Sequence, residues 1–344
     1  MKKLIILICL LAIIVSCKKT PDYNADDYPL GGGIFILNEG NFMGGNGSLS
    51  FYSYDSLKIY NDLFQSINLR PLGDVPFSMA IREDKGYIVV NNSGKIEIIN
   101  STTFESTATI NNLISPRNIA FINSSKAYVT SLYSDSVAVI DLFSNSISGY
   151  INLGRTSEAI VVAGNKAYIS NWAGGNEIMV VNTLDNMVVD SIEVGIEPES
   201  MVIDRNARLW VLCTGGWSGT EAAKLIQIDI GTNSVLNTYT FPIDQSIPSS
   251  LTIDSYRQTL YYLDGGVKQM DIALDRLPNN PIIAETGATF YKLAVNPSNG
   301  DIFVTDAVDY AQKGYVMIYK NDGTFISKER ADIIPGSMCF KLRL

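Results

Sequence analysis

The chain has 344 residues, with 35 acidic against 26 basic side chains, a formal net charge of −9 and no histidine. The acidic excess and the lack of a basic patch argue against a nucleic-acid partner. The absence of histidine excludes Ser-His-Asp and Cys-His catalysis, as well as copper, zinc or haem sites ligated by histidine. It also removes the usual acid–base group near neutral pH, so we expect no enzymatic activity and no cofactor.

The N-terminus starts with a short basic segment and continues as an apolar run. Lys2 and Lys3 precede the run Leu4–Val15, which is shorter than the about 20 residues that a membrane-spanning helix needs. Such a run suits a secretory signal, and we assign residues 1–16 to a signal peptide. The run ends in Ile14-Val15-Ser16-Cys17, which resembles a bacterial lipobox.

The lipobox resemblance implies that Cys17 is lipidated and becomes the new N-terminus. Acyl chains would hold the protein at a membrane, since each buried CH₂ contributes about 0.8 kcal/mol. The alternative is an ordinary cleaved signal with an incidental cysteine. Residues 17–31 are polar and contain proline, which predicts a tether, and residues 32–344 form the folded domain. Some bacterial lipoproteins carry acidic residues directly after the cysteine as a signal for export to the cell surface, but here Lys18 and Lys19 come first. The sequence therefore does not determine which membrane leaflet holds the lipid.

A repeated unit dominates the rest of the chain. Its opening motif is often Pro, two further residues and then three apolar or small ones, as in Pro116–Phe121. Copies begin at residues 76, 116, 156, 198, 248, 290 and 335, and those at 156 and 290 lack the proline. A period of about 40–50 residues is typical of one four-stranded blade of a β-propeller.

Three further strands are expected in each unit. The second carries one aromatic residue, which we expect in the core. These aromatic residues are Phe35, Tyr87, Tyr128, Tyr168, Trp210, Tyr261 and Phe303. A third strand often ends in Asp or Asn and is followed by turn residues and a more polar fourth strand, as in Val137–Asp141 and Ile147–Leu153. The sequence therefore predicts an all-β, seven-bladed propeller with four-stranded blades.

The ends of the chain predict how the ring closes. The first unit, which begins at Ile34, has strands two to four but no opening motif. The last motif, Pro335–Phe340, is an opening strand with nothing after it. We expect the C-terminal strand to be the innermost strand of the first blade, which leaves no open sheet edge.

Two segments carry a resemblance to known families. Ala127-Tyr128-Val129-Thr130-Ser131 resembles the Tyr-Val-Thr-Asn repeat of bacterial surface propellers, and Ile36–Phe42 resembles a subgroup of lipoprotein propellers in gut bacteroidetes. Within that subgroup, the BtuG-type proteins capture cobalamin at the cell surface and sit on a TonB-dependent outer-membrane transporter. The resemblance implies a lipid-anchored outer-membrane protein at the cell surface that binds a corrinoid, with such a transporter as its partner.

The candidate ligand site lies on one rim of the predicted ring. In an antiparallel blade, the loops into strand one and the loops joining strands two and three share a face, and these loops are rich in aromatic, amide and charged residues. Loop aromatics often anchor ligands, although each ring could instead pack on its own blade. The candidate ligand-binding residues are Asn38, Glu39, Phe42, Asn91, Arg117, Tyr133, Asn171, Trp172, Trp217, Asp264, Asp306 and Tyr310.

Other functions remain open from the sequence. Asp306 and Asp309 are a candidate calcium site, but they lack the ligand spacing of a calcium loop, so a solvated rim is favoured and no metal is expected. A structural or adhesive module that binds protein or glycan is the main alternative to nutrient capture. A lyase or lactonase using carboxylates and a metal is a third hypothesis, which the lack of histidine disfavours.

Overall fold

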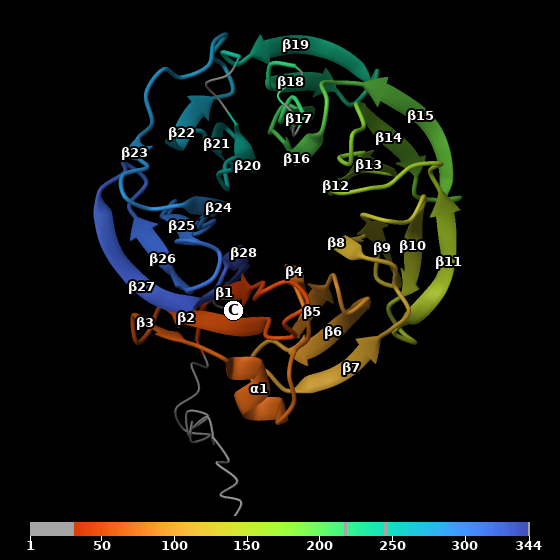
Figure 1. The fold of residues 1–344 in the computed structure, drawn as a ribbon. Helices are drawn as coiled ribbons and strands as arrows, with labels where there is room; N and C mark the ends of the chain where they lie inside the picture. The colour runs from red at the N-terminus through yellow and green to blue at the C-terminus, as the bar shows by residue number, and fades with distance from the viewer. Residues whose placement is uncertain (1–30, 217–218, 220, 244–246, 343–344) are drawn as a thin grey trace, which may run out of the picture.

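The computed structural model describes residues 31–216, 219, 221–243 and 247–342. The predicted signal peptide, Cys17 and all of the predicted tether except Gly31 lie outside these residues, as does Trp217. The described chain forms seven four-stranded antiparallel sheets arranged around a central channel (Figure 1), which confirms the predicted seven-bladed propeller. No helix in the described part is long and apolar enough to cross a membrane.

The strands fall into four positions within the blades. The innermost strands, in blade order, are β28 (Pro335–Lys341), β4 (Pro76–Arg82), β8 (Pro116–Phe121), β12 (Ile160–Ala163), β16 (Pro198–Ile203), β20 (Ser249–Ile253) and β24 (Phe290–Val295). The second strands are β1 (Gly33–Asn38), β5 (Lys85–Val90), β9 (Lys126–Ser131), β13 (Lys166–Ser170), β17 (Arg208–Cys213), β21 (Thr259–Leu263) and β25 (Ile302–Asp306).

The third and fourth positions complete each sheet. The third strands are β2 (Ser48–Ser53), β6 (Lys95–Asn100), β10 (Ser136–Asp141), β14 (Glu177–Asn182), β18 (Lys224–Asp229), β22 (Gly266–Asp271) and β26 (Lys313–Tyr319). The outermost are β3 (Lys58–Tyr60), β7 (Ser106–Ile110), β11 (Ser146–Asn152), β15 (Met187–Glu193), β19 (Ser234–Thr240), β23 (Ile283–Ala284) and β27 (Phe325–Ile333). Blades one and six therefore have very short outer strands.

The ring closes as the sequence predicts. The C-terminal strand β28 pairs antiparallel with β1, with Ile34 opposite Phe340 and Ile36 opposite Met338. The first blade therefore has the strand order β28-β1-β2-β3, and Figure 1 shows the C-terminal strand beside the N-terminal one. Because β1 is paired with β28 on one side and β2 on the other, it has no open sheet edge.

The core is divided into seven apolar clusters, each lying between two neighbouring blades. The cluster between blades two and three, for example, joins Tyr87 and Ile98 to Val129 and Ile140. The aromatic residue of each second strand is buried in one of these clusters, as expected: Phe35, Tyr87, Tyr128, Tyr168, Trp210, Tyr261 and Phe303. Blade-to-blade packing of strand side chains is thus the main source of burial.

One short helix departs from the repeat. Helix α1 (Leu63–Asn68) follows the short strand β3 on the outside of the ring (Figure 1), and its Leu63 and Phe64 are buried in the cluster between blades one and two. A partly buried ion pair holds the segment after it: Arg70 donates to both carboxylate oxygens of the fully buried Glu97 on β6, at 2.6 and 3.2 Å. Lys95, Ser106 and Thr109 also donate to this carboxylate.

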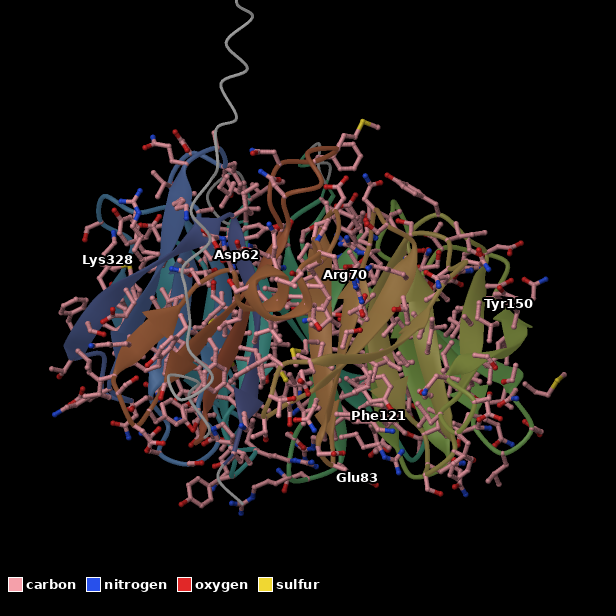
Figure 2. The ribbon with its side chains drawn as sticks, turned by 90° about the horizontal axis from the view of Figure 1, so that it is seen from below. Asp62, Arg70, Glu83, Phe121, Tyr150 and Lys328 are labelled. Atoms are coloured by element: carbon pink, nitrogen blue, oxygen red, sulfur yellow. The ribbon has the colours of Figure 1, made fainter. Side chains whose placement is uncertain are left out.

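We name the two faces of the disc by their loops. The upper face carries the loops into the innermost strands and the loops between second and third strands. The lower face carries the turns between first and second strands, such as the one that includes Glu83, which Figure 2 shows at the bottom of the side view. The channel runs between the two faces, and its wall is formed by the innermost strands.

Candidate functional site

The upper end of the channel is bordered by a group of charged and aromatic side chains that we call the channel mouth. It is made of Glu39, Phe77, Arg117, Glu158, Glu199, Tyr291 and Lys292. All except Glu39 come from the start of innermost strands or the loops leading into them, while Glu39 directly follows β1. A cavity of about 460 Å³ lies in the channel below, lined in part by Phe77, Glu158, Glu199 and Lys292.

The charges of the channel mouth form two ion pairs. Arg117 donates in bidentate fashion to Glu158, from Nε to Oε2 at 2.7 Å and from Nη2 to Oε1 at 2.8 Å. Its guanidinium also lies 3.4 Å from the centre of the Phe77 ring, a cation–π geometry. On the opposite side, Lys292 donates to Glu199 at 3.3 Å. Each positive side chain of the channel mouth therefore has a carboxylate partner, so its net charge is small.

Glu39 links the first and last blades across this group. The Tyr291 hydroxyl donates to Glu39 Oε1 at 2.9 Å. Burial raises the pKa of the Glu39 carboxyl, although Lys292, the Tyr291 hydrogen bond and Arg117 act in the other direction. Burial and the neighbouring Glu39 carboxylate raise the pKa of the Tyr291 hydroxyl, so it stays a hydrogen-bond donor at neutral pH. The link positions the loop that carries Phe42.

Glu199 differs from Glu39 because its ion pair dominates. Burial by itself would raise the pKa of Glu199, but the Lys292 charge and hydrogen bonds from Ser200 and Ser250 lower it below the ordinary value. The Ser250 backbone N–H donates to Glu199 Oε2 at 3.0 Å. Glu199 therefore stays ionised at neutral pH and holds the innermost strands of blades five, six and seven together.

Exposed aromatic side chains lie on the loops of the upper face. Phe42 is 67% exposed, Tyr133 is 77% exposed and Tyr310 is 47% exposed. Tyr310 packs edge-on against Tyr291, with ring centroids 5.6 Å apart. Trp172 is half-buried, and its indole N–H is buried without a hydrogen-bond partner among the described residues. These rings present apolar surface on the upper face, and Tyr310 does so next to the channel mouth.

Four of the predicted site residues are buried and make hydrogen bonds within the fold. Asn38 and Asp306 are buried: Asn38 donates to Ser48 and Ser50, and Asp306 accepts from backbone N–H groups and from Lys328. The Asn91 and Asn171 amides are also buried, and they donate to the backbone carbonyls of Pro116 and Thr156 in the loops leading into innermost strands. Their hydrogen bonds therefore hold the loops of the rim in place.

Two further predicted residues lie apart from the mouth or outside the structure. Asp264 lines a separate cavity of about 480 Å³ beside Phe241 and Lys268, away from the channel. Trp217 lies outside the described residues. Conversely, Lys292 belongs to the channel mouth although it was not among the predicted site residues; it occupies the position after Tyr291 in a copy of the opening motif that lacks its proline. A positive charge at that position of the repeat was the available signal.

The comparisons with known proteins identify a family. Residues 32–331 match the family model described as Domain of unknown function (DUF5074). The chain belongs to this family. No curated protein matches the sequence.

Solved structures similar to this DUF5074 propeller share its fold. A quinonprotein alcohol dehydrogenase-like protein from Bacteroides thetaiotaomicron superposes with a TM-score of 0.68 at 15% identity, covering 91% of this chain and 79% of that one. A functionally unknown protein from Desulfotomaculum acetoxidans superposes with a TM-score of 0.69 at 12% identity, covering 91% and 99%. At these identities the similarity establishes the propeller architecture alone.

Other features of this DUF5074 propeller are less suited to a ligand. The described residues contain no group of three or more Asp, Glu, Cys or His side chains placed to hold a metal ion. Asp309 accepts hydrogen bonds from the backbone N–H groups of Ala311 and Gln312, as in a capped turn.

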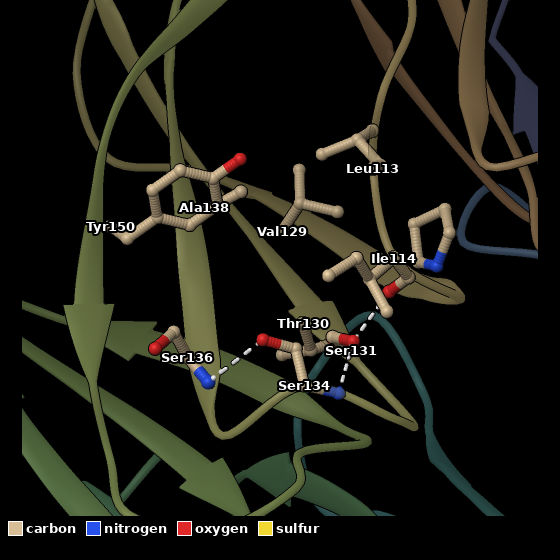
Figure 3. A pocket seen from close by; sticks show the side chains of 10 residues that line it. Leu113, Ile114, Val129, Thr130, Ser131, Ser134, Ser136, Ala138 and Tyr150 are labelled. Atoms are coloured by element: carbon tan, nitrogen blue, oxygen red, sulfur yellow. Dashed lines mark hydrogen bonds between the residues drawn. The ribbon is translucent and has the colours of Figure 1, made fainter.

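A pocket in blade three, bordered by Ile114, Ser131 and Tyr150 (Figure 3), has a volume of only about 10 Å³. That volume is at the limit for a single water molecule.

Proposed function

We propose that the protein is a non-catalytic ligand-binding propeller whose upper face captures a nutrient, with a corrinoid such as cobalamin as the ligand. The observation that carries the proposal is the combination of exposed aromatic rings with a channel mouth whose charges are already paired. A corrinoid has a broad apolar macrocycle edged by neutral amide groups. Aromatic rings can cover such a face, and burying it contributes about 25 cal/mol per Å² before the costs of association.

The paired charges favour a neutral polar ligand over a charged one. Arg117 and Lys292 already have carboxylate partners, so an anionic ligand would have to compete with Glu158 and Glu199. Amide groups of a neutral ligand can donate hydrogen bonds to the carboxylates, or accept them from the cations, without breaking the ion pairs. The identity of the ligand as a corrinoid rests on the resemblance of the segment Ile36–Phe42, which leads into this site.

The position of the first strand is compatible with a surface-anchored arrangement. Gly33 pairs with Lys341 and Ser53, which places the beginning of β1 at the lower face. A lipidated tether before this residue would join the disc at the lower face. Such a tether would leave the upper face free to face a TonB-dependent transporter, which we propose as the partner in the outer membrane.

Replacing the aromatic anchors should weaken cobalamin binding. Truncating one well-placed aromatic side chain commonly costs more than about 1 kcal/mol, so we expect Tyr310→Ala, Trp172→Ala or Trp217→Ala each to raise the dissociation constant about ten-fold. Isothermal titration calorimetry with cobalamin measures this change.

Tyr87→Phe is the matched control for these variants. Tyr87 is buried between blades two and three, away from the rim loops. The affinity of the Tyr87→Phe variant for cobalamin should therefore stay within about two-fold of wild type. Absence of binding at micromolar cobalamin by the wild-type protein would refute the corrinoid proposal. Binding of a purified surface glycan or protein instead would favour the structural or adhesive alternative.

Membrane attachment should depend on Cys17. Replacing Cys17 by Ala removes the thiol that would carry the lipid, so the variant should move to the soluble fraction after cell lysis. Detergent partitioning followed by immunoblotting measures the distribution. Cys213→Ala, in strand β17, is the control and should leave the distribution unchanged. A Cys17→Ala variant that stays in the membrane fraction would contradict lipid anchoring at this residue.

A further inference from the structure

The lower end of the channel holds a second cavity, distinct from the channel mouth. Its volume is about 670 Å³, and it is bounded by the ends of the innermost strands β12, β16 and β20 and the turns that follow β12, β16 and β20. Its apolar lining includes Val161, Met201, Ile203 and Ile253. No predicted ligand-binding residue contributes to it, so it is independent of the proposed function.

Two arginines border this cavity. Arg205 follows β16 in blade five, and Arg257 lies in the turn between β20 and β21 in blade six. The two turns are tied together, because the Arg205 backbone N–H donates to the Arg257 carbonyl at 3.0 Å. Both residues are exposed, and neither guanidinium makes an ion pair with any residue that the structure describes. Two arginines on adjacent, hydrogen-bonded turns therefore border the same cavity.

The nearby carboxylate does not compensate for these charges by direct contact. Asp204 is the acidic residue in the cavity lining, and it is buried. Its oxygens accept from the backbone N–H groups of Asn206 and Arg208 and from the Trp210 indole at 2.8 to 3.0 Å. Asp204 therefore shapes the turn, and the two guanidinium groups keep their donors available.

The mouth of the cavity is open because small residues surround it. Ala163, Gly164 and Ala207 lie in its lining. Gly164 has a φ of +55° and no other atom within 4 Å of where a Cβ would stand, so nothing covers the chain at this point. A ligand could reach the apolar wall and the two arginines from the lower solvent.

We propose that this lower cavity is a binding site for an amphipathic oxyanion, meaning a carboxylate or phosphate group attached to an apolar body. Guanidinium forks match the geometry of carboxylate and phosphate oxygens and bind them through charge-assisted hydrogen bonds. The apolar wall takes the hydrocarbon part, as in most small-molecule pockets. Because the chain as a whole is acidic, the attraction comes from this arginine pair and not from the net charge.

The test uses simple probes and the full chain carrying Cys17→Ala, which removes the predicted lipid attachment. Octyl phosphate and octanoate are titrated into the protein, and binding is followed by ligand-detected NMR. Two half-probes serve as controls: 1-octanol carries only the apolar chain, and inorganic phosphate carries only the oxyanion. A ligand of this size should bind with a dissociation constant of about 1 mM. Each half-probe should bind about ten-fold more weakly, and the tighter of the two amphiphiles identifies the preferred oxyanion.

Single arginine variants localise the binding. Arg205→Ala and Arg257→Ala should each weaken binding of the better amphiphile about ten-fold. Arg276→Ala is the matched control, because Arg276 is also exposed in blade six but does not line the cavity, and it should bind like wild type. Circular dichroism melting checks that all variants fold. Binding of 1-octanol as tight as octyl phosphate, an equal loss in Arg276→Ala, or no binding of either amphiphile at about 10 mM would overturn the proposal.

Discussion

Removing residues 335–344 is expected to cost most of the protein's stability. The deletion removes strand β28 and with it the inner partner of β1. The half-buried side chains of Met338, Cys339 and Phe340 and the backbone ladder of this joint together contribute about 5 kcal/mol, which is comparable to the whole stability of a typical protein. We expect a melting temperature at least about 10 °C lower, or loss of soluble protein through the exposed edge of β1.

The control deletion removes only residues 342–344, which follow β28. Leu342 is exposed, so this shorter deletion should leave the melting temperature within about 2 °C of wild type. Differential scanning calorimetry compares the three proteins. Equal melting temperatures for the long deletion and the wild type would show that the ring does not depend on its C-terminal strand.

Replacing Glu97 by Gln should have the second-largest effect on stability. Glu97 is fully buried in strand β6 and accepts from Arg70, Lys95, Ser106 and Thr109. Removing one partner of a buried ion pair leaves an uncompensated charge, and here we expect about 3 kcal/mol. This value is at the low end of the usual range because the Arg70 side chain is 41% exposed and can be hydrated.

The same variant has a distinct pH signature. Burial by itself would raise the pKa of Glu97, but hydrogen bonds from Arg70, Ser106 and Lys95 outweigh it and hold the pKa below the ordinary value of 4.5. A carboxyl with a depressed folded-state pKa contributes stability above its unfolded pKa and loses that contribution as the pH falls through its folded pKa. The stability difference between wild type and Glu97→Gln should therefore be constant near neutral pH and shrink below about pH 4.5.

Urea denaturation at pH 7 and at several values below pH 4.5 measures this difference. Glu193→Gln is the control, because Glu193 is exposed on the outer strand β15 and should change the free energy of unfolding by less than about 0.5 kcal/mol at any pH. A difference for Glu97→Gln that does not change with pH would mean that the carboxylate charge contributes nothing and that only packing is lost.

The sequence by itself determined the architecture, because each blade carries its own local signals. The opening prolines mark innermost strands, single aromatics such as Tyr128 mark second strands, and the unpaired motif at Pro335 required closure with the first blade. These signals are local: each depends on the alternation of side chains along one strand and on turn residues beside it. The repetition of the pattern made the blade number countable without any knowledge of contacts between blades.

Only the tertiary structure decided which rim residues are available to a ligand. Asn91 and Asn171 occupy the expected loops, yet their amides are used by the loops that lead into innermost strands. Lys292 meets Glu199 across 93 positions of sequence. In the sequence, Glu97 is an acidic residue within an apolar strand, and only the folded chain brings Arg70 into contact with it. Polar groups are satisfied by partners from other blades and loops, and a repeat pattern contains no information about which partner that is.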